Sequence, residues 1–323
     1  MTHEVTLIPG DWIGPETCAV VQLVLDGAGA DIRWDVQPLT VETLDRVVES
    51  ARRTGTVLSA RVETRREAGQ LPPTVELRKR LGVFSSIRPV RALPYSNARF
   101  PDLDLFVVRE LSEDIYAGFE HEVTDGVYEA IKITTKEACE RIARWTYQVA
   151  RKHGRERVTI VHKSNIMKRS DGLFLATALE VGKEFPEIRT DEVIVDALCM
   201  KLVRWPGSFD VLLSGNLFGD IVSDLVSGLA GGITASATSS YGDGVAIFSN
   251  PHGRAEDLVG RDLANPIPML LSSLWMLRHL GELELHDRVY SAMMRTLADG
   301  VRTRDMGGSA TCTELGAGIL ARL

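Results

Sequence analysis

Short runs of apolar residues alternate with amphipathic patterns along this 323-residue chain, and this alternation restricts the possible fold most strongly. A short apolar run bounded by turn residues is typical of a buried strand, whereas apolar residues three and four apart are typical of a helix. Residues Thr134 to His153 have the helical spacing, with Thr134 and Glu137 as a predicted capping box. The run from Met269 to Leu280 is apolar on more than one face, which predicts a buried helix. The strand-like runs are LDLFVV (103–108), VTIV (158–161) and FDVLL (209–213). Strands that alternate with helices in this way predict an α/β fold.

One segment interrupts the alternation. Residues Glu120 to Thr134 have β-type residues on both sides of a turn at Thr124-Asp125-Gly126, which predicts a β-hairpin. A two-stranded hairpin on its own is only marginally stable in water. We therefore expect this hairpin to pack either on its own domain or on a second subunit.

The composition excludes several classes of function. With 44% hydrophobic residues, the chain can form one large or two medium globular domains. Its net charge of −7 and the lack of a Lys/Arg-rich run argue against nucleic-acid binding. The chain has no apolar run of 18 residues, so no membrane span is predicted. The polar start MTHEVTLIPG does not resemble a signal peptide. Four scattered cysteines predict free thiols in a reducing cytoplasm.

The stretch NLFGDIVSD (216–224) follows a predicted strand and contains two acidic residues four apart, and a predicted helix begins at about Gly219. Asp220 and Asp224 therefore share one face of a helix. Two neighbouring carboxylates repel each other unless a cation lies between them, so the pair is a candidate site for a divalent metal. The alternative is an ordinary helix N-terminus with acidic residues that interact with the helix dipole.

Basic residues also follow predicted strands. Lys163 ends the VTIV strand, two residues before Asn165, and a lysine held in a cleft there could transfer protons. Arg109 follows the LDLFVV strand, with Tyr116 seven residues further on. Together with Arg78 and Arg88, Arg109 could bind a di- or tricarboxylate, because a guanidinium pairs with a carboxylate through two hydrogen bonds. Taken singly, each could instead be an exposed surface residue.

A late loop, SNPHGRAEDLVGRDLANP (249–266), contains a candidate for nucleotide recognition. The carboxylate of Asp257 could hold the ribose hydroxyls of an NAD adenosine and repel the extra phosphate of NADP. The glycine fingerprint of an ordinary Rossmann turn does not follow any predicted strand. The alternative is a surface loop without a ligand.

These stretches occur in the same order in a known family. The markers are GDWIGPE, LRKRL with IRP, RELSEDIYAG, HKSNIMK, DALCMKLV, NLFGDIVSD, HGRAED with ANP, and MGGSATCTE. Together they resemble the β-decarboxylating dehydrogenases, which include isocitrate, homoisocitrate, 3-isopropylmalate and tartrate dehydrogenases. The similarity spans nearly the whole chain and is closest in character to NAD-dependent isocitrate dehydrogenase.

The resemblance implies two α/β domains with a cleft between them and not a standard Rossmann fold. One domain would contain residues 1–93 and 232–323 with the cofactor loop, and the other residues 94–231 with the dimer interface. The protein would be at least a homodimer with shared active sites, and the hairpin at about 120–134 would form a clasp arm between subunits.

The resemblance also assigns roles to individual residues. Tyr116, Lys163 and Asp196 would be catalytic, with Tyr116 and Lys163 transferring protons. Asp220 and Asp224, together with Asp196 of a neighbouring subunit, would bind Mg²⁺ or Mn²⁺. The substrate-binding residues would be Thr74, Arg78, Arg88, Arg109, Tyr116 and Lys163. The residues at NAD would be Asn165, His252, Gly253, Arg254, Asp257 and Asn265.

The implied reaction is NAD-dependent oxidative decarboxylation of a 2-hydroxy-3-carboxy acid in the cytoplasm. The alternatives are a regulatory subunit without turnover, or an isopropylmalate, homoisocitrate or tartrate dehydrogenase. The stretch LPPTVELR, which precedes the first arginine and selects the substrate in the family, fits none of the usual patterns. Trp12, Ser249 and Arg254 replace the glycine, glutamate and small residue that the family usually has near the cofactor, and Phe218 replaces a tyrosine. These changes lead us to expect a specialised substrate, with Arg254 bound to an extra anionic group such as a phosphonate or carboxylate, or to the NAD pyrophosphate.

Overall fold

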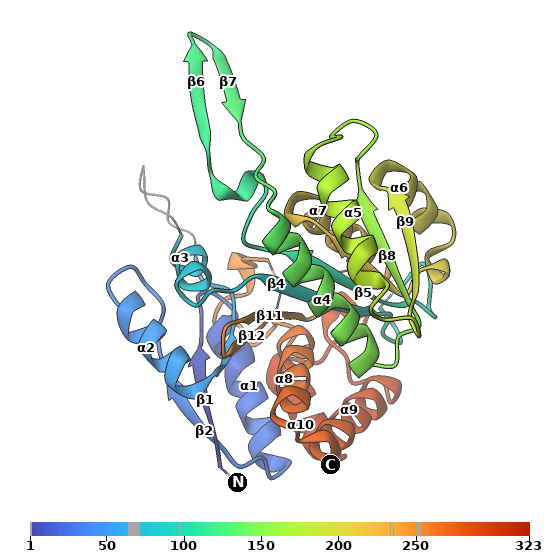
Figure 1. Cartoon of the computed structure of the whole chain (residues 1–323). Coiled ribbons are helices and arrows are strands. Elements are labelled where there is room, and N and C mark those ends of the chain that lie inside the picture. Colours follow the sequence, from blue (N-terminus) through green and yellow to red (C-terminus); the bar gives the residue numbers. More distant parts are fainter. Residues whose placement is uncertain (1, 64–71, 97, 233, 235, 251–252) are drawn as a thin grey trace. The chain divides into compact units, whose positions relative to one another are not determined.

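The computed structural model describes residues 2–63, 72–96, 98–232, 234, 236–250 and 253–323 (Figure 1). The chain divides into two compact units. The first contains Met1–Val83, Ala92–Pro101 and Ala230–Leu323, and the second contains Phe84–Arg91 and Asp102–Leu229. The stretch Phe84–Arg91 belongs to the second unit because β4 (Ser85–Arg91) pairs along its whole length with β5 (Asp104–Glu110). The sequence had assigned this stretch to the first domain.

The strands of the first unit lie in the order β2-β1-β3-β12-β11. Pairing is parallel except between β11 and β12, which form an antiparallel pair. The strands are β1 (His3–Ile8), β2 (Ile32–Val36), β3 (Thr56–Ser59), β11 (Thr238–Gly242) and β12 (Val245–Ser249). All four residues of β3 are buried, which agrees with its place in the middle of this order.

Helices of the first unit pack on these strands and on one another. Helix α1 packs against α8 and α10, and α8 also contacts β12 and β3. The helix predicted at 269–280 is α8, and it is largely buried, as its apolar sequence indicated. The helices are α1 (Gly14–Gly27), α2 (Leu44–Thr54), α3 (Pro73–Arg80), α8 (Ile267–Leu280), α9 (Leu283–Ala298) and α10 (Cys312–Leu320).

The strands of the second unit lie in the order β4-β5-β10-β8-β9. Among these five strands, only β4 runs antiparallel to its neighbour. The other strands are β8 (Arg157–His162), β9 (Arg189–Ile194) and β10 (Val211–Ser214), and the helices are α4 (Lys136–Lys152), α5 (Ser170–Gly182), α6 (Val195–Arg204) and α7 (Asn216–Leu229). The carboxyl ends of the parallel strands β5, β8 and β10 share one edge, which brings the segments after these strands together.

The predicted hairpin is present as a separate two-stranded sheet, β6 (Glu120–Thr124) and β7 (Val127–Ala130). Figure 1 shows it as a long arm between the turn Ile115–Ala117 and α4. Every residue of both strands is exposed, including Val123, Val127 and Tyr128. Such an arm lacks a hydrophobic face packed on its own chain, within the part of the molecule that the structure describes.

Local details correct two predictions. Thr135, not Thr134, is the N-cap of α4, because its hydroxyl accepts the hydrogen bond from the Ala138 N–H. Helix α7 begins at Asn216, directly after β10, rather than near Gly219. All four cysteines are free thiols, as expected. Among the described residues, none of the helices is both long and apolar enough to cross a membrane.

Candidate active site

Arg109 lies at the carboxyl end of β5 and contacts α7. Its Nε and Nη2 atoms donate to the Asn216 side-chain oxygen at 2.9 and 2.6 Å, and its Nη1 forms an ion pair with Asp220. These contacts place the guanidinium along the first turns of α7. The sequence predicted both Arg109 and Asp220 as site residues but did not predict that they contact each other.

Tyr116 reaches the same aspartate from the short turn Ile115–Ala117. Its hydroxyl donates to the second carboxylate oxygen of Asp220 at 2.6 Å, and the Arg109 guanidinium lies 5.0 Å from the centre of its ring. Burial raises the pKa of Tyr116, and the hydrogen bond to Asp220 raises it further. Tyr116 therefore keeps its proton at neutral pH.

The second aspartate of α7 pairs with the arginine of β4. Arg88 forms an ion pair with Asp224, one turn along the helix from Asp220. Two aspartates on one face of α7 are thus matched by two arginines from neighbouring strands, as the spacing of four residues requires. We refer to Arg88, Arg109, Tyr116, Asp220 and Asp224 as the arginine–aspartate cluster.

Gly219 allows this close approach of α7 to β5. A Cβ atom at this position would lie 2.8 Å from Cγ and 2.9 Å from Cβ of Arg109, which is closer than real side chains come. The stem of Arg109 therefore passes directly over Gly219. A glycine is needed at this position because a side chain would not fit. Its backbone conformation does not require glycine, since its φ angle is an ordinary one.

Lys163 and Asp196 form a second group. The Lys163 ammonium, after β8, donates to Asp196 in the first turn of α6 at 2.7 Å. This hydrogen bond from Lys163 holds the pKa of Asp196 below its usual range. Asp196 is largely exposed, and Asn165 is exposed two residues after Lys163. The structure brings Lys163 and Asp196 together, although they are separated in sequence by α5 and β9.

The donor chemistry of the acidic residues fits a hard divalent cation. Asp196, Asp220 and Asp224 are carboxylates, the ligands that Mg²⁺ and Mn²⁺ prefer. Among the described residues of this single chain, no three His, Cys, Asp or Glu side chains lie together as a metal site. The resemblance assigns Asp196 to a neighbouring subunit's site, so this assignment stays a prediction.

The predicted site residues of the first unit lie in α3 and in the segment that precedes α8. Thr74 and Arg78 are in α3, and Val75 beside them is exposed. Asp257 is exposed in the short turn Glu256–Leu258. Asn265 accepts from the Ile267 N–H at 2.9 Å and donates to Asp305 at 2.8 Å, so it also stabilises the start of α8. His252 lies outside the described residues.

Two of the unusual residues contact each other. The Arg254 guanidinium lies 5.3 Å from the centre of the Trp12 ring, within the range of a cation–π interaction. Arg254 also lies 3.5 Å from Glu256, and Gly253 beside it is exposed. The φ angle of Trp12 is 52°, a left-handed value that is unfavourable for a bulky residue and suits glycine. Trp12 thus occupies a glycine-type position and contacts Arg254 of the same unit.

Sequence reasoning missed the residues that hold this loop in place. Glu16, from the motif GDWIGPE, accepts a hydrogen bond from the Ala264 N–H at 3.1 Å. Asp262 accepts from the Thr313 N–H at 3.0 Å and from its hydroxyl at 2.9 Å, which ties the loop to the start of α10. The signal available was the presence of both residues inside quoted motifs, but a motif alone does not show which backbone group it contacts.

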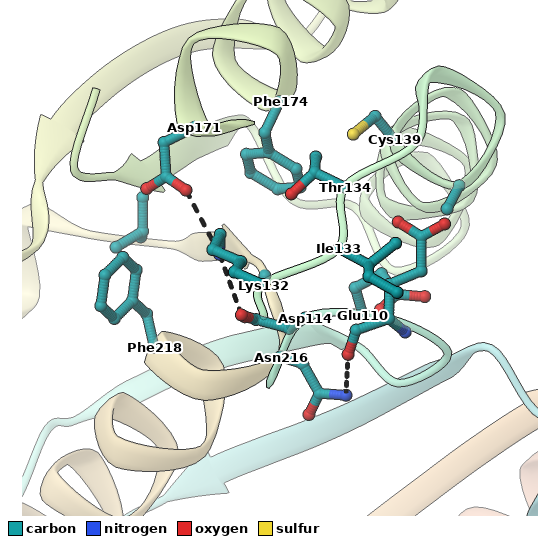
Figure 2. Close-up of a pocket in the computed structure, with 14 residues that line it drawn as sticks. Glu110, Asp114, Lys132, Ile133, Thr134, Cys139, Asp171, Phe174, Asn216 and Phe218 are labelled. Atoms are coloured by element: carbon teal, nitrogen blue, oxygen red, sulfur yellow. Dashed lines mark hydrogen bonds and ion pairs between the residues drawn. The ribbon is translucent and has the colours of Figure 1, made fainter. Parts of the chain in front are cut away.

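A buried polar group in the second unit was also missed. Figure 2 shows a small cavity that is lined by Asp114, Lys132 and Asp171, among other residues. Cys139 lies there too, and burial raises the pKa of its thiol to about 12, so the thiol stays protonated. Single acidic or basic residues in turns resemble ordinary surface residues, so no pattern in the sequence indicates this group.

Comparison with known proteins identifies the fold and the family. A family model described as isocitrate/isopropylmalate dehydrogenase matches residues 4–319. The chain belongs to this family. It is 42% identical to the NAD isocitrate dehydrogenase catalytic subunit 5 of Arabidopsis thaliana, over 98% of this chain and 88% of that protein. It is 40% identical to a mitochondrial NAD isocitrate dehydrogenase regulatory subunit of Dictyostelium discoideum, over 97% and 89%.

A solved structure supports the same identification. The chain superimposes on isocitrate dehydrogenase from Methylococcus capsulatus with a TM-score of 0.93 and 34% identity, over 99% of each chain. The predicted family, the two-domain α/β dehydrogenase fold and the class of oxidoreductase are thereby confirmed. The roles of individual site residues stay predictions.

Adding a methyl group at Gly219 should disturb the cluster. In Gly219→Ala, Arg109 must shift, and we expect kcat/KM to fall by about 10²-fold, because small displacements of positioning groups have effects of this size. The unfolding free energy should fall by about 1–3 kcal/mol from overpacking. Steady-state kinetics and thermal unfolding measure both effects.

Gly228→Ala is the matched control on the same helix. A Cβ atom at Gly228 meets no other group within 4 Å. This variant should keep its activity and gain roughly 0.5–1 kcal/mol of stability, because alanine favours helix more than glycine does. Equal kinetics in the two variants would show that the close contact at Gly219 is unimportant.

Proposed function

We propose that the protein catalyses NAD-dependent and divalent-metal-dependent oxidative decarboxylation of a 2-hydroxy-3-carboxy acid. The observation that carries this proposal is the arginine–aspartate cluster. It joins two arginines, two aspartates and a protonated tyrosine by ion pairs and a hydrogen bond within one unit, which supports binding of carboxylates and a metal there. Membership of the isocitrate/isopropylmalate dehydrogenase family supports the same reaction class.

The cofactors are NAD and Mg²⁺ or Mn²⁺, as predicted. The relatives named above carry NAD in their names, and the exposed carboxylate of Asp257 is suited to the ribose hydroxyls of an adenosine. Asp220 and Asp224, with Asp196 of a second chain, would hold the metal. When bound, the metal lowers the pKa of the substrate hydroxyl and polarises the ketone, and NAD accepts the hydride.

The residues of the chain would then move protons and hold charge. Arg88 and Arg109 would bind the substrate carboxylates through paired hydrogen bonds, together with Arg78. Lys163, in its neutral amine form, would take the proton of the C2 hydroxyl as hydride leaves C2. After carbon dioxide has left, Tyr116 would give its proton to C3. The pKa of Tyr116, raised by burial and by Asp220, keeps that proton available at neutral pH.

An assay with a panel of acids tests the proposal. Isocitrate, 3-isopropylmalate, homoisocitrate and tartrate are each incubated with NAD and Mn²⁺, and NADH is followed by its absorbance. We expect NADH from at least one acid, and none after chelation of the metal. A total lack of NADH over the whole panel, with substrate binding retained, would favour the alternative of a regulatory subunit.

Removing either proton-transfer group should reduce rate far more than binding. Lys163→Met and Tyr116→Phe should each lower kcat by roughly 10²–10⁴-fold, the usual range for general acid–base groups. Substrate affinity, measured by calorimetry, should change little. Unchanged turnover in either variant would refute that residue's role.

The regulatory alternative is not decided by overall identity. The catalytic and the regulatory relatives differ by only two percentage points in identity to this chain, at 42% and 40%. The residues themselves favour turnover, because a subunit without turnover does not need the proton-transfer and metal-binding groups. All five of these groups are present, namely Tyr116, Lys163, Asp196, Asp220 and Asp224.

The protein acts as at least a homodimer with shared active sites. The exposed hairpin, with Val123, Val127 and Tyr128 open to solvent, supports a contact with a second chain, and the relatives are named as subunits. Its cytoplasmic location stays a prediction from the sequence, since the relatives named above are mitochondrial.

Complementation between inactive variants tests the shared site. If each site takes Tyr116 from one chain and Lys163 from the other, a mixed dimer of Tyr116→Phe and Lys163→Met has one intact site. Refolding a mixture should therefore restore about a quarter of wild-type activity, because about half of the dimers are mixed. Each variant refolded alone is the control. Lack of recovery, with mixed dimers confirmed by mass spectrometry, would place both residues in the same subunit's site.

We further propose that the substrate differs from the substrates of the usual members of the family. Trp12 and Arg254, two of the unusual residues, are in contact, which supports a common origin for the changes. We keep the hypothesis that Arg254 binds an extra anionic group, either on the substrate, such as a phosphonate or carboxylate, or in the NAD pyrophosphate. Its ion pair with Glu256 is largely exposed, so an incoming anion would compete with little loss.

Arg254→Thr distinguishes these ligands. If Arg254 binds a substrate anion, kcat/KM should fall by about tenfold or more for the preferred acid and little for the others, since a charged hydrogen bond contributes about 1.5–3 kcal/mol. If it binds the pyrophosphate, the KM for NAD should rise equally with every acid. No change in any of these constants would exclude both roles.

A further inference from the structure

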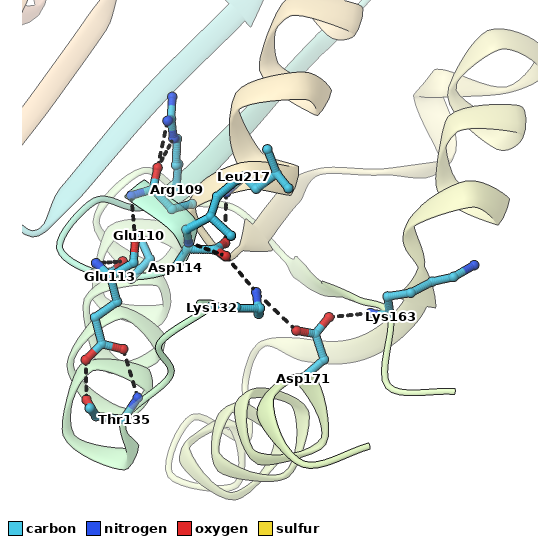
Figure 3. A network of polar contacts seen from close by, with 11 residues as sticks. Arg109, Glu110, Glu113, Asp114, Lys132, Thr135, Lys163, Asp171 and Leu217 are labelled. Atoms are coloured by element: carbon cyan, nitrogen blue, oxygen red, sulfur yellow. Dashed lines mark hydrogen bonds and ion pairs between the residues drawn. The ribbon is translucent and has the colours of Figure 1, made fainter. Parts of the chain in front are cut away.

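Lys132 lies at the base of the hairpin arm, between β7 and α4, and its ammonium is surrounded by partners (Figure 3). It donates to Asp114 at 3.0 Å and forms an ion pair with Asp171 at 3.3 Å. The side chains of these two aspartates are only 4% and 5% exposed. On a further side, the ammonium lies 5.6 Å from the centre of the Phe218 ring. Its three N–H groups thus have two carboxylates and an aromatic face around them.

Asp114 is held in an unusual backbone conformation two residues before Tyr116. Its φ of 77° and ψ of −157° lie in a region that is almost restricted to glycine, and such a conformation persists only where the surroundings impose it. One oxygen of its carboxylate accepts from Lys132 and from the Ile115 N–H at 2.9 Å. The other accepts from the Leu217 N–H at 2.9 Å. These bonds fix the turn that carries Tyr116 to the start of α7.

Asp171 makes the corresponding contact with the second proton-transfer group. Its other oxygen accepts a hydrogen bond from the backbone N–H of Lys163 at 2.6 Å. Lys132 therefore connects, through one carboxylate on each side, the turn of Tyr116 and the backbone of Lys163. Figure 3 shows this chain of contacts passing from Asp114 through Lys132 to Asp171 and Lys163.

The cavity beside these groups is small. Its volume of about 20 Å³ corresponds to roughly one water molecule, and Phe174 and Phe218 contribute apolar surface to it. A single neutral water that enters there cannot replace the positive charge of Lys132. A carboxylate that loses Lys132 is left as an uncompensated buried charge, so it and the segments bonded to it should move.

We propose that Lys132 is a positioning residue for both proton-transfer groups, acting on Tyr116 through Asp114 and on Lys163 through Asp171. The proposal rests on the function proposed above for Tyr116 and Lys163. Because these two residues of one chain would serve different sites of the dimer, a single half-buried lysine would help to order both sites.

Kinetics of Lys132→Met provide the first test. This change keeps most of the length of the side chain, which becomes one atom shorter, and removes its charge. We expect kcat to fall by about 10²-fold, with the KM for the acid changed by less than about threefold, since misplacement slows reaction more than binding. Lys136→Met, on the exposed surface of α4 with its side chain 72% exposed, is the matched control and should keep wild-type kinetics.

Two readouts separate positioning from a general loss of folded enzyme. In heavy water, wild-type enzyme should place deuterium on one face of C3, as NMR of the product shows, whereas Lys132→Met should lose part of this selectivity because Tyr116 is misplaced. Amide hydrogen exchange should be faster around residues 114–117 and 163–165 and unchanged in the rest of the unit. Both quantities are independent of the fraction of active molecules.

Asp171→Asn is the second variant, in case Lys132→Met does not fold. It preserves the shape of the side chain but replaces one carboxylate oxygen with an NH₂ group, which then faces either Lys132 or the backbone N–H of Lys163. Amide hydrogen exchange should therefore be faster around Lys163. Unchanged exchange in both segments, or uniformly faster exchange over the unit, would overturn the proposal whatever the activity. If the wild-type enzyme reduces NAD with none of the acids, the proposed function fails, while the exchange result still decides whether Lys132 orders the two segments.

Discussion

The packing of α7 against β5 at Gly219 is the constraint on which the rest of the cluster depends. The stem of Arg109 lies where a side chain at 219 would be, and this lets its guanidinium reach Asn216 and Asp220 on the same helix. Asp220 then also accepts the Tyr116 hydroxyl. One close approach of a helix to a strand thereby sets the geometry of an arginine, an aspartate and a tyrosine.

Charge balance explains why these groups tolerate one another. Asp220 and Asp224 would repel each other on one helix face, but each is paired with an arginine from a neighbouring strand. The same rule applies to the buried pair Asp114 and Asp171, which share Lys132. A buried ion pair adds little net stability compared with apolar residues, whereas removing one partner costs about 3–5 kcal/mol. Such groups are therefore better suited to fixing positions than to stabilising the fold.

Several features could be predicted from the sequence because they depend on neighbours along the chain. The spacing of Asp220 and Asp224 placed both on one helix face, and the turn at Asp125-Gly126 indicated the hairpin. The exact cap of α4 was mispredicted because Thr134 and Thr135 are adjacent and chemically equivalent, and only the backbone geometry selects Thr135. Helix α7 begins earlier than predicted because Asn216 follows β10 almost directly and its side chain also binds Arg109.

The sequence alone determined the α/β class, the family resemblance and a list of residues able to bind carboxylates, metal and NAD. These follow from local periodicity and from motifs that need no knowledge of distant contacts. Only the tertiary structure decided which of those residues meet within each unit, and it added Asp114, Lys132 and Asp171. The reason is physical: a buried charge is stable only beside partners from other segments, and those partners become neighbours only when the chain has folded. The same holds for Trp12, since its left-handed backbone and its contact with Arg254 are properties of the folded turn and not of the residue itself.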